Sequence, residues 1–268
     1  MSKARIYARN LLASWARNET GEQNMPKGHF MQRAMLQFGG KVLKTLRTVG
    51  LVKAFRIAKS RLIAFVEDRR RGISAAKSVW PKEMAIENLE YHCYRVTDYD
   101  IFRDAMQHVT VREDEDVFVD YGSGKGRVLV MAAEYAFRKV IGVDFSVPLN
   151  KIAQENVNHA IPAVRCKDIE IVQADATQWP LPHDCTVLYF YNPFHGKILA
   201  QVVENIRRSL AEAPRTLTII FARPVYFEQE TAWRDWLDKK HEFDCPEYKV
   251  AIYETKDFRD VQKQQGVA

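Results

Sequence analysis

Residues 117–127 combine an apolar segment, a carboxylate and three closely spaced glycines, a set of residue types that favours ligand binding. The sequence there runs Val-Phe-Val-Asp-Tyr-Gly-Ser-Gly-Lys-Gly-Arg, and a second apolar run ends on Asp144, 18 residues after Gly126. Glycines let the backbone turn sharply and approach a ligand closely, because a side chain there would occupy the ligand's space. A carboxylate at Asp144 can accept hydrogen bonds from both hydroxyls of a ribose. The pattern therefore predicts a nucleoside pocket.

The glycine spacing excludes two common nucleotide motifs. A dinucleotide fingerprint, G-x-G-x-x-G, would need its third glycine at position 127, which is Arg127. A phosphate loop needs a lysine followed by Ser or Thr, but Lys125 is followed by Gly126. The pattern that remains is D-x-G-x-G-x-G, beginning at Asp120.

This pattern resembles the class I S-adenosylmethionine-dependent methyltransferases, over roughly residues 90–255 and most sharply from Val117 to Asp144. The resemblance implies that Asp120 reaches the methionine part of the cofactor and that Asp144 holds the ribose. Asp175, at the end of a third predicted strand, would contact the adenine amine, although in isolation it equally suits a turn cap. The resemblance places cofactor contacts at Tyr94, Thr97, Asp120, Gly122, Ser123, Gly124, Gly126, Asp144, Asp175 and Ala176.

The upstream segment Tyr94-Arg95-Val96-Thr97 extends the resemblance. It is similar to the Y-x-P-T segment of small seven-strand lysine methyltransferases and of bacterial proteins like the non-SET histone-lysine methyltransferases, with Val96 in the usual place of proline. The resemblance implies that Tyr94 and Thr97 close over the cofactor.

The segment Asn192-Pro193-Phe194 follows an apolar run at the expected mouth of a fourth strand. An amide oxygen, a proline-held carbonyl and an aromatic ring can orient an amine for in-line attack on a methyl group. These residues therefore indicate a nitrogen acceptor. They resemble the [DN]-P-P-[FYW] motif of adenine and glutamine amine methyltransferases, with one proline fewer, and the N-N-F motif of the non-SET histone-lysine methyltransferases. The alternative is a strand that ends in a proline turn with an aromatic plug.

Apolar runs and helical spacing alternate from about residue 81 onward, which predicts an α/β fold with a parallel sheet covered on both faces. The resemblance implies a Rossmann-like sheet of seven strands, mostly parallel, with a C-terminal antiparallel hairpin. Strands are predicted at 117–121, 139–144, 169–173, 186–191 and 216–221, a hairpin at 241–253, and helices at 99–108, 126–137, 148–160, 197–210 and 228–240, with Ser146 as the cap of the third.

Charge is divided unevenly along the chain. Residues 1–80 hold 17 Lys and Arg against 4 Asp and Glu, a net of +13, while residues 81–268 hold 23 against 30, a net of −7. We expect two parts, a basic helical N-terminal segment at 1–80, with one amphipathic helix or two broken near Gly50, and a methyltransferase domain at 81–268. The segment could cap the catalytic domain, contact RNA, DNA or anionic lipid, or act as a targeting peptide.

The sequence thus predicts an S-adenosylmethionine-dependent methyltransferase that acts on a nitrogen, preferably a protein lysine. The alternatives are an adenine amine of nucleic acid, a small molecule, or a binding module that keeps the cofactor only for structure. No apolar run is long enough to cross a membrane, the four cysteines lack metal-ligand spacing, and we expect a cytoplasmic protein without a metal. Lys125 and Arg127 are expected to face solvent, with contact to an acidic partner or to the cofactor carboxylate as the alternative, and His195 could assist deprotonation.

Overall fold

The structure is a computed structural model of the 268-residue chain, and it describes residues 51–75, 90, 95–160, 163–229 and 235–256. The chain divides into two compact units, residues 1–61 and 62–268, with the boundary inside helix α3 (Leu51–Arg71). This boundary lies closer to the N-terminus than residue 80. α3 falls within the segment for which the sequence predicts a basic amphipathic helix, and the part of that prediction before residue 51 lies outside the described residues.

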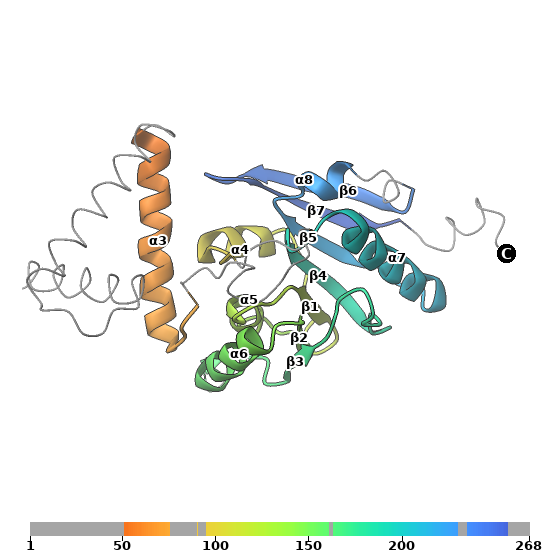
Figure 1. Ribbon diagram of the computed structural model, residues 1–268, viewed down its shortest axis with the longest axis horizontal. Helices are drawn as coiled ribbons and strands as arrows, with labels where there is room; N and C mark the ends of the chain where they lie inside the picture. Colours follow the sequence, from red (N-terminus) through yellow and green to blue (C-terminus); the bar gives the residue numbers. More distant parts are fainter. Residues whose placement is uncertain (1–50, 76–89, 91–94, 161–162, 230–234, 257–268) are drawn as a thin grey trace, which may run out of the picture. The chain divides into compact units, whose positions relative to one another are not determined.

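The second unit contains one seven-stranded sheet with the order β3-β2-β1-β4-β5-β7-β6 (Figure 1). The first five strands in this order are parallel, and β7 is antiparallel to both β5 and β6, which confirms the predicted fold class. The direction of strand progression reverses between β1 and β4, where open sheets bind their ligands. The strands are β1 (Val117–Tyr121), β2 (Lys139–Asp144), β3 (Ile169–Gln173), β4 (Cys185–Tyr191), β5 (Thr218–Ala222), β6 (Leu237–Asp244) and β7 (Lys249–Thr255).

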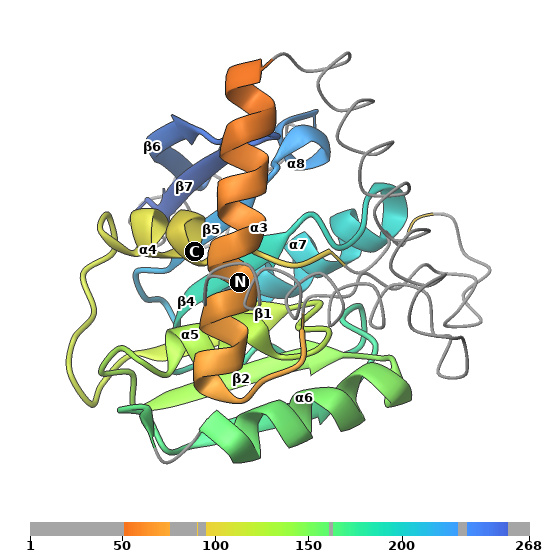
Figure 2. The same cartoon turned by 90° about the vertical axis from the view of Figure 1, so that its left-hand side faces the viewer.

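The helices of this unit cover both faces of the sheet. Figures 1 and 2 show α5 and α6 next to each other, close to β1 and β2. Their apolar side chains and those of α4 form one buried cluster, while α7 and α8 contribute to a second one. These helices are α4 (Tyr99–Met106), α5 (Arg127–Ala132), α6 (Val147–Ala160), α7 (Gly196–Glu212) and α8 (Val225–Gln229).

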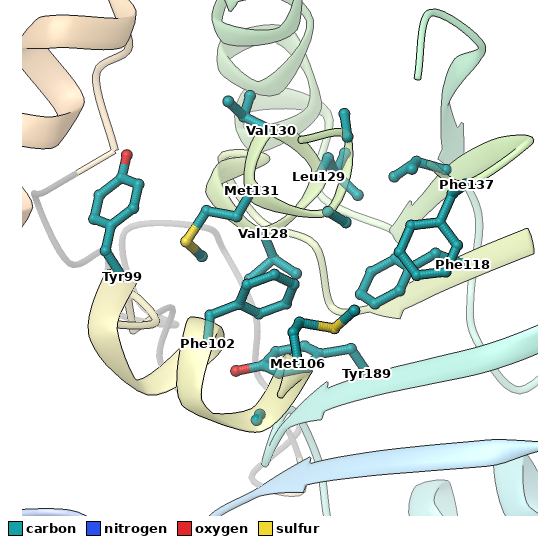
Figure 3. Packing of buried hydrophobic residues seen from close by; sticks show 14 of the residues in the cluster. Tyr99, Phe102, Met106, Phe118, Val128, Leu129, Val130, Met131, Phe137 and Tyr189 are labelled. Atoms are coloured by element: carbon teal, nitrogen blue, oxygen red, sulfur yellow. The ribbon is translucent and has the colours of Figure 1, made fainter. Parts of the chain in front are cut away.

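Aromatic packing fixes α4 against the sheet. The ring of Phe102 on α4 lies edge-on to Phe118 of β1, with 6.2 Å between the ring centroids, and edge-on to Tyr189 of β4, with 5.6 Å between the centroids. Figure 3 shows these three side chains between α4 and the sheet. All three rings are buried, and such pairs each contribute roughly 0.5–1.5 kcal/mol beyond their area. The segment that leads into α4, with Thr97, is thereby held beside the ends of β1 and β4.

Two predicted helices differ from the structure. The helix expected over 228–240 is wrong in its second part, because β6 begins at Leu237 and pairs with β7. Lysines that satisfy a helical pattern are equally suited to an exposed strand, where Lys239 and Lys249 both bind Glu242. The helix expected over 126–137 ends at Ala132, since the chain must turn back to enter β2 at Lys139.

In the described part of the chain, no helix combines the length and the apolar character needed to cross a membrane.

Candidate active site

The glycine segment forms a tight loop between β1 and α5. Gly122, Gly124 and Gly126 have φ values of +78°, +53° and +74°, a region that side chains rarely adopt. The amides of Gly122 and Ser123 both donate to the carbonyl of Val143 on β2, at 2.8 and 3.2 Å. The loop is therefore tied to the adjacent strand at the point where the sheet order reverses.

Two of these glycines are required by neighbouring protein atoms. A Cβ at Gly122 would lie 2.7 Å from the Cβ of Pro193, and one at Gly126 would lie 3.0 Å from the Cβ of Ala153. The sequence argument that the glycines make space for a ligand is thus incomplete. At Gly122 the missing side chain lets the β4 loop sit directly on the glycine loop.

Asp144 at the end of β2 holds the loop in place. Its Oδ2 accepts the amide of Gly124 at 2.9 Å, and its Oδ1 accepts the amide of Ser146 at 2.8 Å. Burial raises the pKa of this carboxyl, while the two amide donors act in the opposite direction. Each carboxylate oxygen has a second lone pair, so both can also accept a ribose hydroxyl. Ser146 directly precedes α6 as predicted, and its carbonyl accepts the amide of Asn150 at 3.0 Å, but its Oγ has no hydrogen-bond partner among the described residues.

Asp120 is the acid ahead of the glycines, and only 3% of its surface is exposed. Burial raises its pKa well above the usual range, and the negative charge of Asp144 raises it further. A carboxyl in this environment favours a neighbouring cation, which would offset both effects. Asp120 therefore suits a positively charged part of a ligand.

A pocket opens beside Asp120 at the carboxyl ends of β1 and β4. Its polar groups include a carboxyl group, two guanidinium groups and hydroxyl groups, so it can receive a ligand that carries charges of both signs. The lining residues are Arg95, Thr97, Asp120, Gly122, Ser123, Arg127, Val128, Tyr189 and Tyr191. Four of the predicted cofactor residues thus meet here, namely Thr97, Asp120, Gly122 and Ser123. Tyr94 lies outside the described residues.

The predicted adenine contacts lie after β3. Asp175 is exposed, and its Oδ1 accepts both the amide and the hydroxyl of Thr177 at 2.8 Å. This is the turn-cap arrangement that the sequence left open. Ala176 is buried in the cluster formed with α7. Neither residue lines the pocket described above.

The segment after β4 brings Asn192 and Pro193 to the glycine loop. Asn192 adopts φ +42° and is 8% exposed, and its Oδ1 has no hydrogen-bond partner within the described ranges. Pro193 contacts Gly122 as described above. Phe194 is 2% exposed and lies edge-on to Phe190 at 6.3 Å. The position of Phe194 favours packing over contact with an acceptor.

Glu90 and His195 anchor the start of α7. The amide of His195 donates to the carbonyl of Glu90 at 3.0 Å, and a side-chain oxygen of Glu90 accepts the amide of Ile198 at 3.1 Å. The imidazole of His195 stacks on the ring of Tyr226 at 4.6 Å. These contacts fix the loop that carries Asn192.

Sequence reasoning missed several residues of the site. Lys125 and Arg127 are 6% and 3% exposed, so the expectation that they face solvent is wrong. Arg127 is buried because Asp68 on α3 binds its guanidinium, and only the tertiary structure brings the two together. Tyr189 and Tyr191 match an apolar strand pattern, and no local signal distinguishes their pocket role.

The comparison with protein families gives one match at the site. Residues 118–213 match a family described as a methyltransferase domain. These residues include most of β1 and the glycine loop, which line the pocket, and also Asp144 and the Asn192 segment, which contact that loop. Over these residues the chain is a methyltransferase domain. The chain is therefore a methyltransferase enzyme, and S-adenosylmethionine is its cofactor.

Solved structures of methyltransferases are similar to this chain, whereas no curated protein sequence matches it. An RNA methyltransferase from Salinibacter ruber, in complex with S-adenosyl-L-homocysteine, is 19% identical, covers 60% of this chain and 93% of its own, and has a TM-score of 0.43. A ribosomal protein L11 methylase from Lactobacillus delbrueckii subsp. bulgaricus is 14% identical, covers 58% and 77%, and has a TM-score of 0.45. An S-adenosylmethionine-dependent methyltransferase from Aquifex aeolicus is 17% identical, covers 57% and 88%, and has a TM-score of 0.43.

The residues of the methyltransferase site fit this cofactor. The buried carboxyl of Asp120 favours a cation, the fixed carboxylate of Asp144 can accept hydroxyls, and the unpaired Oδ1 of Asn192 lies on the segment in contact with the loop. When bound, S-adenosylmethionine supplies an electrophilic methyl group on a sulfonium.

Proposed function

We propose that this methyltransferase transfers the methyl group to a nitrogen, and that the acceptor is the side-chain amine of a protein lysine. The observation that carries this proposal is the buried, unpaired amide oxygen of Asn192 at the end of β4. A buried acceptor without a donor costs about 1–3 kcal/mol, so the site favours a substrate that brings an N–H or O–H group. A neutral amine brings that donor and also the lone pair that attacks the methyl group.

The backbone of Asn192 supports a functional role for its side chain. A non-glycine residue with φ +42° is strained, and such residues cluster at active sites because the conformation aims a side chain. Pro193 rests on Gly122, so the amide is held at a fixed position relative to the glycine loop. Orientation of this kind supplies much of the rate in a displacement that needs little acid–base chemistry.

Tyr191 gives the pocket a neutral polar wall. Burial raises the pKa of its phenol to about 12, so the phenol stays protonated at neutral pH. It can therefore hydrogen-bond to a substrate but does not act as a resting base. A lysine acceptor would lose its proton to solvent before it is enclosed.

We propose the cofactor contacts that the sequence predicts, and the pocket beside Asp120 supports those at Thr97, Asp120, Gly122 and Ser123. Asp120 and Thr97 would hold the methionine end, the loop at Gly122, Ser123, Gly124 and Gly126 would pass beneath it, and Asp144 would hold the ribose. Asp175 and Ala176 would lie on the adenine side, and Tyr94 would close over the cofactor together with Thr97. Each assignment is tested by the affinity of S-adenosylhomocysteine for a variant at that position, which is asparagine for each aspartate, valine for Ala176 and alanine for the other residues.

The acceptor is tested with labelled S-adenosylmethionine and a whole-cell lysate. After reaction with the full-length protein, the products are digested separately with protease and with nuclease. Label released by protease and recovered as methyllysine supports the proposal. Label released only by nuclease points to a nucleobase amine, and label in low-mass material points to a metabolite. Either result overturns the lysine assignment without affecting the cofactor assignment.

Asn192 is tested with two substitutions. Glycine adopts the positive φ without strain but lacks the amide, so Asn192→Gly should bind S-adenosylhomocysteine within about twofold of wild type while methyl transfer falls about 10- to 100-fold. Asn192→Asp retains an oxygen acceptor and should keep more activity than Asn192→Gly. Full activity in Asn192→Gly would contradict the proposed role.

A second candidate is contact of the basic N-terminal segment with a polyanion, favoured by its net charge of +13. Within the described part of α3, Arg71 already binds Glu67 and Glu134, so this cation is engaged by the protein itself. The contribution of the segment is measured by following the binding of RNA and of anionic vesicles at increasing salt concentration. The full chain is compared with a chain that starts near residue 62. Equal affinity and salt slope for both chains would exclude it.

A further inference from the structure

We infer that Arg127 binds the carboxylate of the cofactor's methionine moiety, and that Asp68 on α3 is the positioning residue that holds its guanidinium there. The inference requires the cofactor of the methyltransferase but not the lysine acceptor proposed above. It assigns a role in the cofactor site to the helix that precedes the catalytic domain.

Arg127 is fixed by three groups. Its Nη2 donates to Oδ2 of Asp68, and its Nη1 donates to the carbonyl of Thr97 at 3.2 Å. The guanidinium also lies over the ring of Tyr99, 5.1 Å from the centroid. Tyr99 donates its hydroxyl to Oδ1 of Asp68 at 2.8 Å, so both oxygens of Asp68 are engaged. The side chain of Arg127 is thus held in one orientation.

Not every donor of Arg127 is used within the described protein. Its Nε is buried and has no hydrogen-bond partner among the residues that the structure describes, and Arg127 lines the pocket together with Asp120. A guanidinium has five N–H donors in a planar fork, and the edge formed by Nε and one terminal nitrogen matches a carboxylate with two parallel hydrogen bonds. The missing partner is therefore an anion of carboxylate geometry.

Arg215 shows how an arginine with a purely structural role differs. Its Nε donates to the carbonyl of Cys185 at 2.6 Å, and its terminal nitrogens donate to three further carbonyls and to a hydroxyl, at 2.8–3.1 Å. All five donors are used within the protein. Arg127 is more deeply buried than Arg215 but leaves its Nε unpaired.

The charges of the pocket match an amino-acid end. Asp120 and Arg127 line the same pocket with opposite charges, and the methionine part of the cofactor carries an ammonium and a carboxylate. Asp120 suits the ammonium, as argued above. Arg127 is then the complementary group for the carboxylate, beside the hydroxyl of Thr97, which already bonds to Tyr189 at 2.9 Å.

Ligands that differ only in the amino-acid end test the inference. S-adenosylhomocysteine carries the carboxylate, and 5′-methylthioadenosine lacks the whole amino-acid end. The affinities are measured by isothermal titration calorimetry on the full chain. Arg127→Gln should lower the affinity for S-adenosylhomocysteine about 10- to 100-fold and the affinity for 5′-methylthioadenosine by less than about twofold. Asp68→Asn should show the same selectivity with a smaller loss, of about 3- to 10-fold, because the guanidinium is kept but is less well oriented.

Arg103→Gln is the matched control. Arg103 also lies over the ring of Tyr99, at 5.9 Å, and contacts Glu67, but it does not line the pocket. It should leave both affinities unchanged. Equal losses for the two ligands in Arg127→Gln, or no loss for either, would show that Arg127 is only structural and would overturn the inference.

A measurement on the wild-type protein covers the case in which Arg127→Gln does not fold. Decarboxylated S-adenosylmethionine keeps the ammonium and the sulfonium but lacks the carboxylate. It should bind at least about 10-fold more weakly than S-adenosylmethionine. Equal binding of the two compounds would refute recognition of the carboxylate.

Discussion

Replacement of Gly122 by alanine should destabilise the domain by more than a backbone effect alone. At φ +78° an alanine costs about 1–2 kcal/mol. Its Cβ would also lie 2.7 Å from the Cβ of Pro193, well inside the usual carbon–carbon contact of about 3.5–4.0 Å. Overlap of this kind in a packed region typically costs about 1–3 kcal/mol. The expected total is about 2–5 kcal/mol, a large part of a typical domain stability.

Gly72→Ala separates the two contributions. Gly72 ends α3 with φ +68°, and its amide and that of Ile73 close the helix on the carbonyls of Arg69 and Asp68. The nearest atom to a Cβ there is 3.7 Å away, which is an ordinary contact. Gly72→Ala should therefore cost only about 1–2 kcal/mol.

A double-mutant cycle with Pro193→Gly isolates the overlap, because glycine removes the Cβ that the new methyl group would meet. Urea unfolding followed by circular dichroism gives the free energy of unfolding for each variant. In the Pro193→Gly background, Gly122→Ala should cost about as much as Gly72→Ala, so that the coupling energy is about 1–3 kcal/mol. A coupling below about 0.5 kcal/mol would refute the claim that Gly122 is required by Pro193.

Two further predictions concern charge. Burial and the charge of Asp144 raise the pKa of Asp120, so this carboxyl binds a proton more tightly in the folded protein than in the unfolded chain. The free energy of unfolding should therefore fall as the pH rises above about 4. Asp120→Asn should flatten this pH dependence and stabilise the ligand-free protein by about 1–2 kcal/mol at pH 8. The same substitution should lower the affinity for S-adenosylmethionine. An unchanged pH profile in urea unfolding would contradict this prediction. Arg215→Met should destabilise the folded domain by about 2–4 kcal/mol, because it leaves buried carbonyls unpaired. Thermal unfolding should show this loss, while calorimetry should show an unchanged affinity for S-adenosylhomocysteine. Loss of affinity without loss of stability would assign Arg215 to the site instead.

The sequence by itself determined the strands that build the site. The predicted bounds of β1, β2 and β3 agree with the structure. β1 and β2 are buried and appear as short apolar runs between turn residues, whereas β3 is a partly exposed edge strand in which apolar and polar residues are mixed. The positions of Asp120, Gly122 and Asp144 followed from the same local pattern. Each of these features depends on residues close together in the chain, so a linear pattern can encode it.

Only the tertiary structure decided which distant residues meet. Pro193 lies against Gly122 and Asp68 binds Arg127, and both pairs join residues far apart in the chain that no periodicity relates. The strand β6 replaced a predicted helix because pairing with β7 outweighed local propensity. Burial of Arg127 likewise depends on a carboxylate delivered by another helix, since a lone buried charge is too costly to persist.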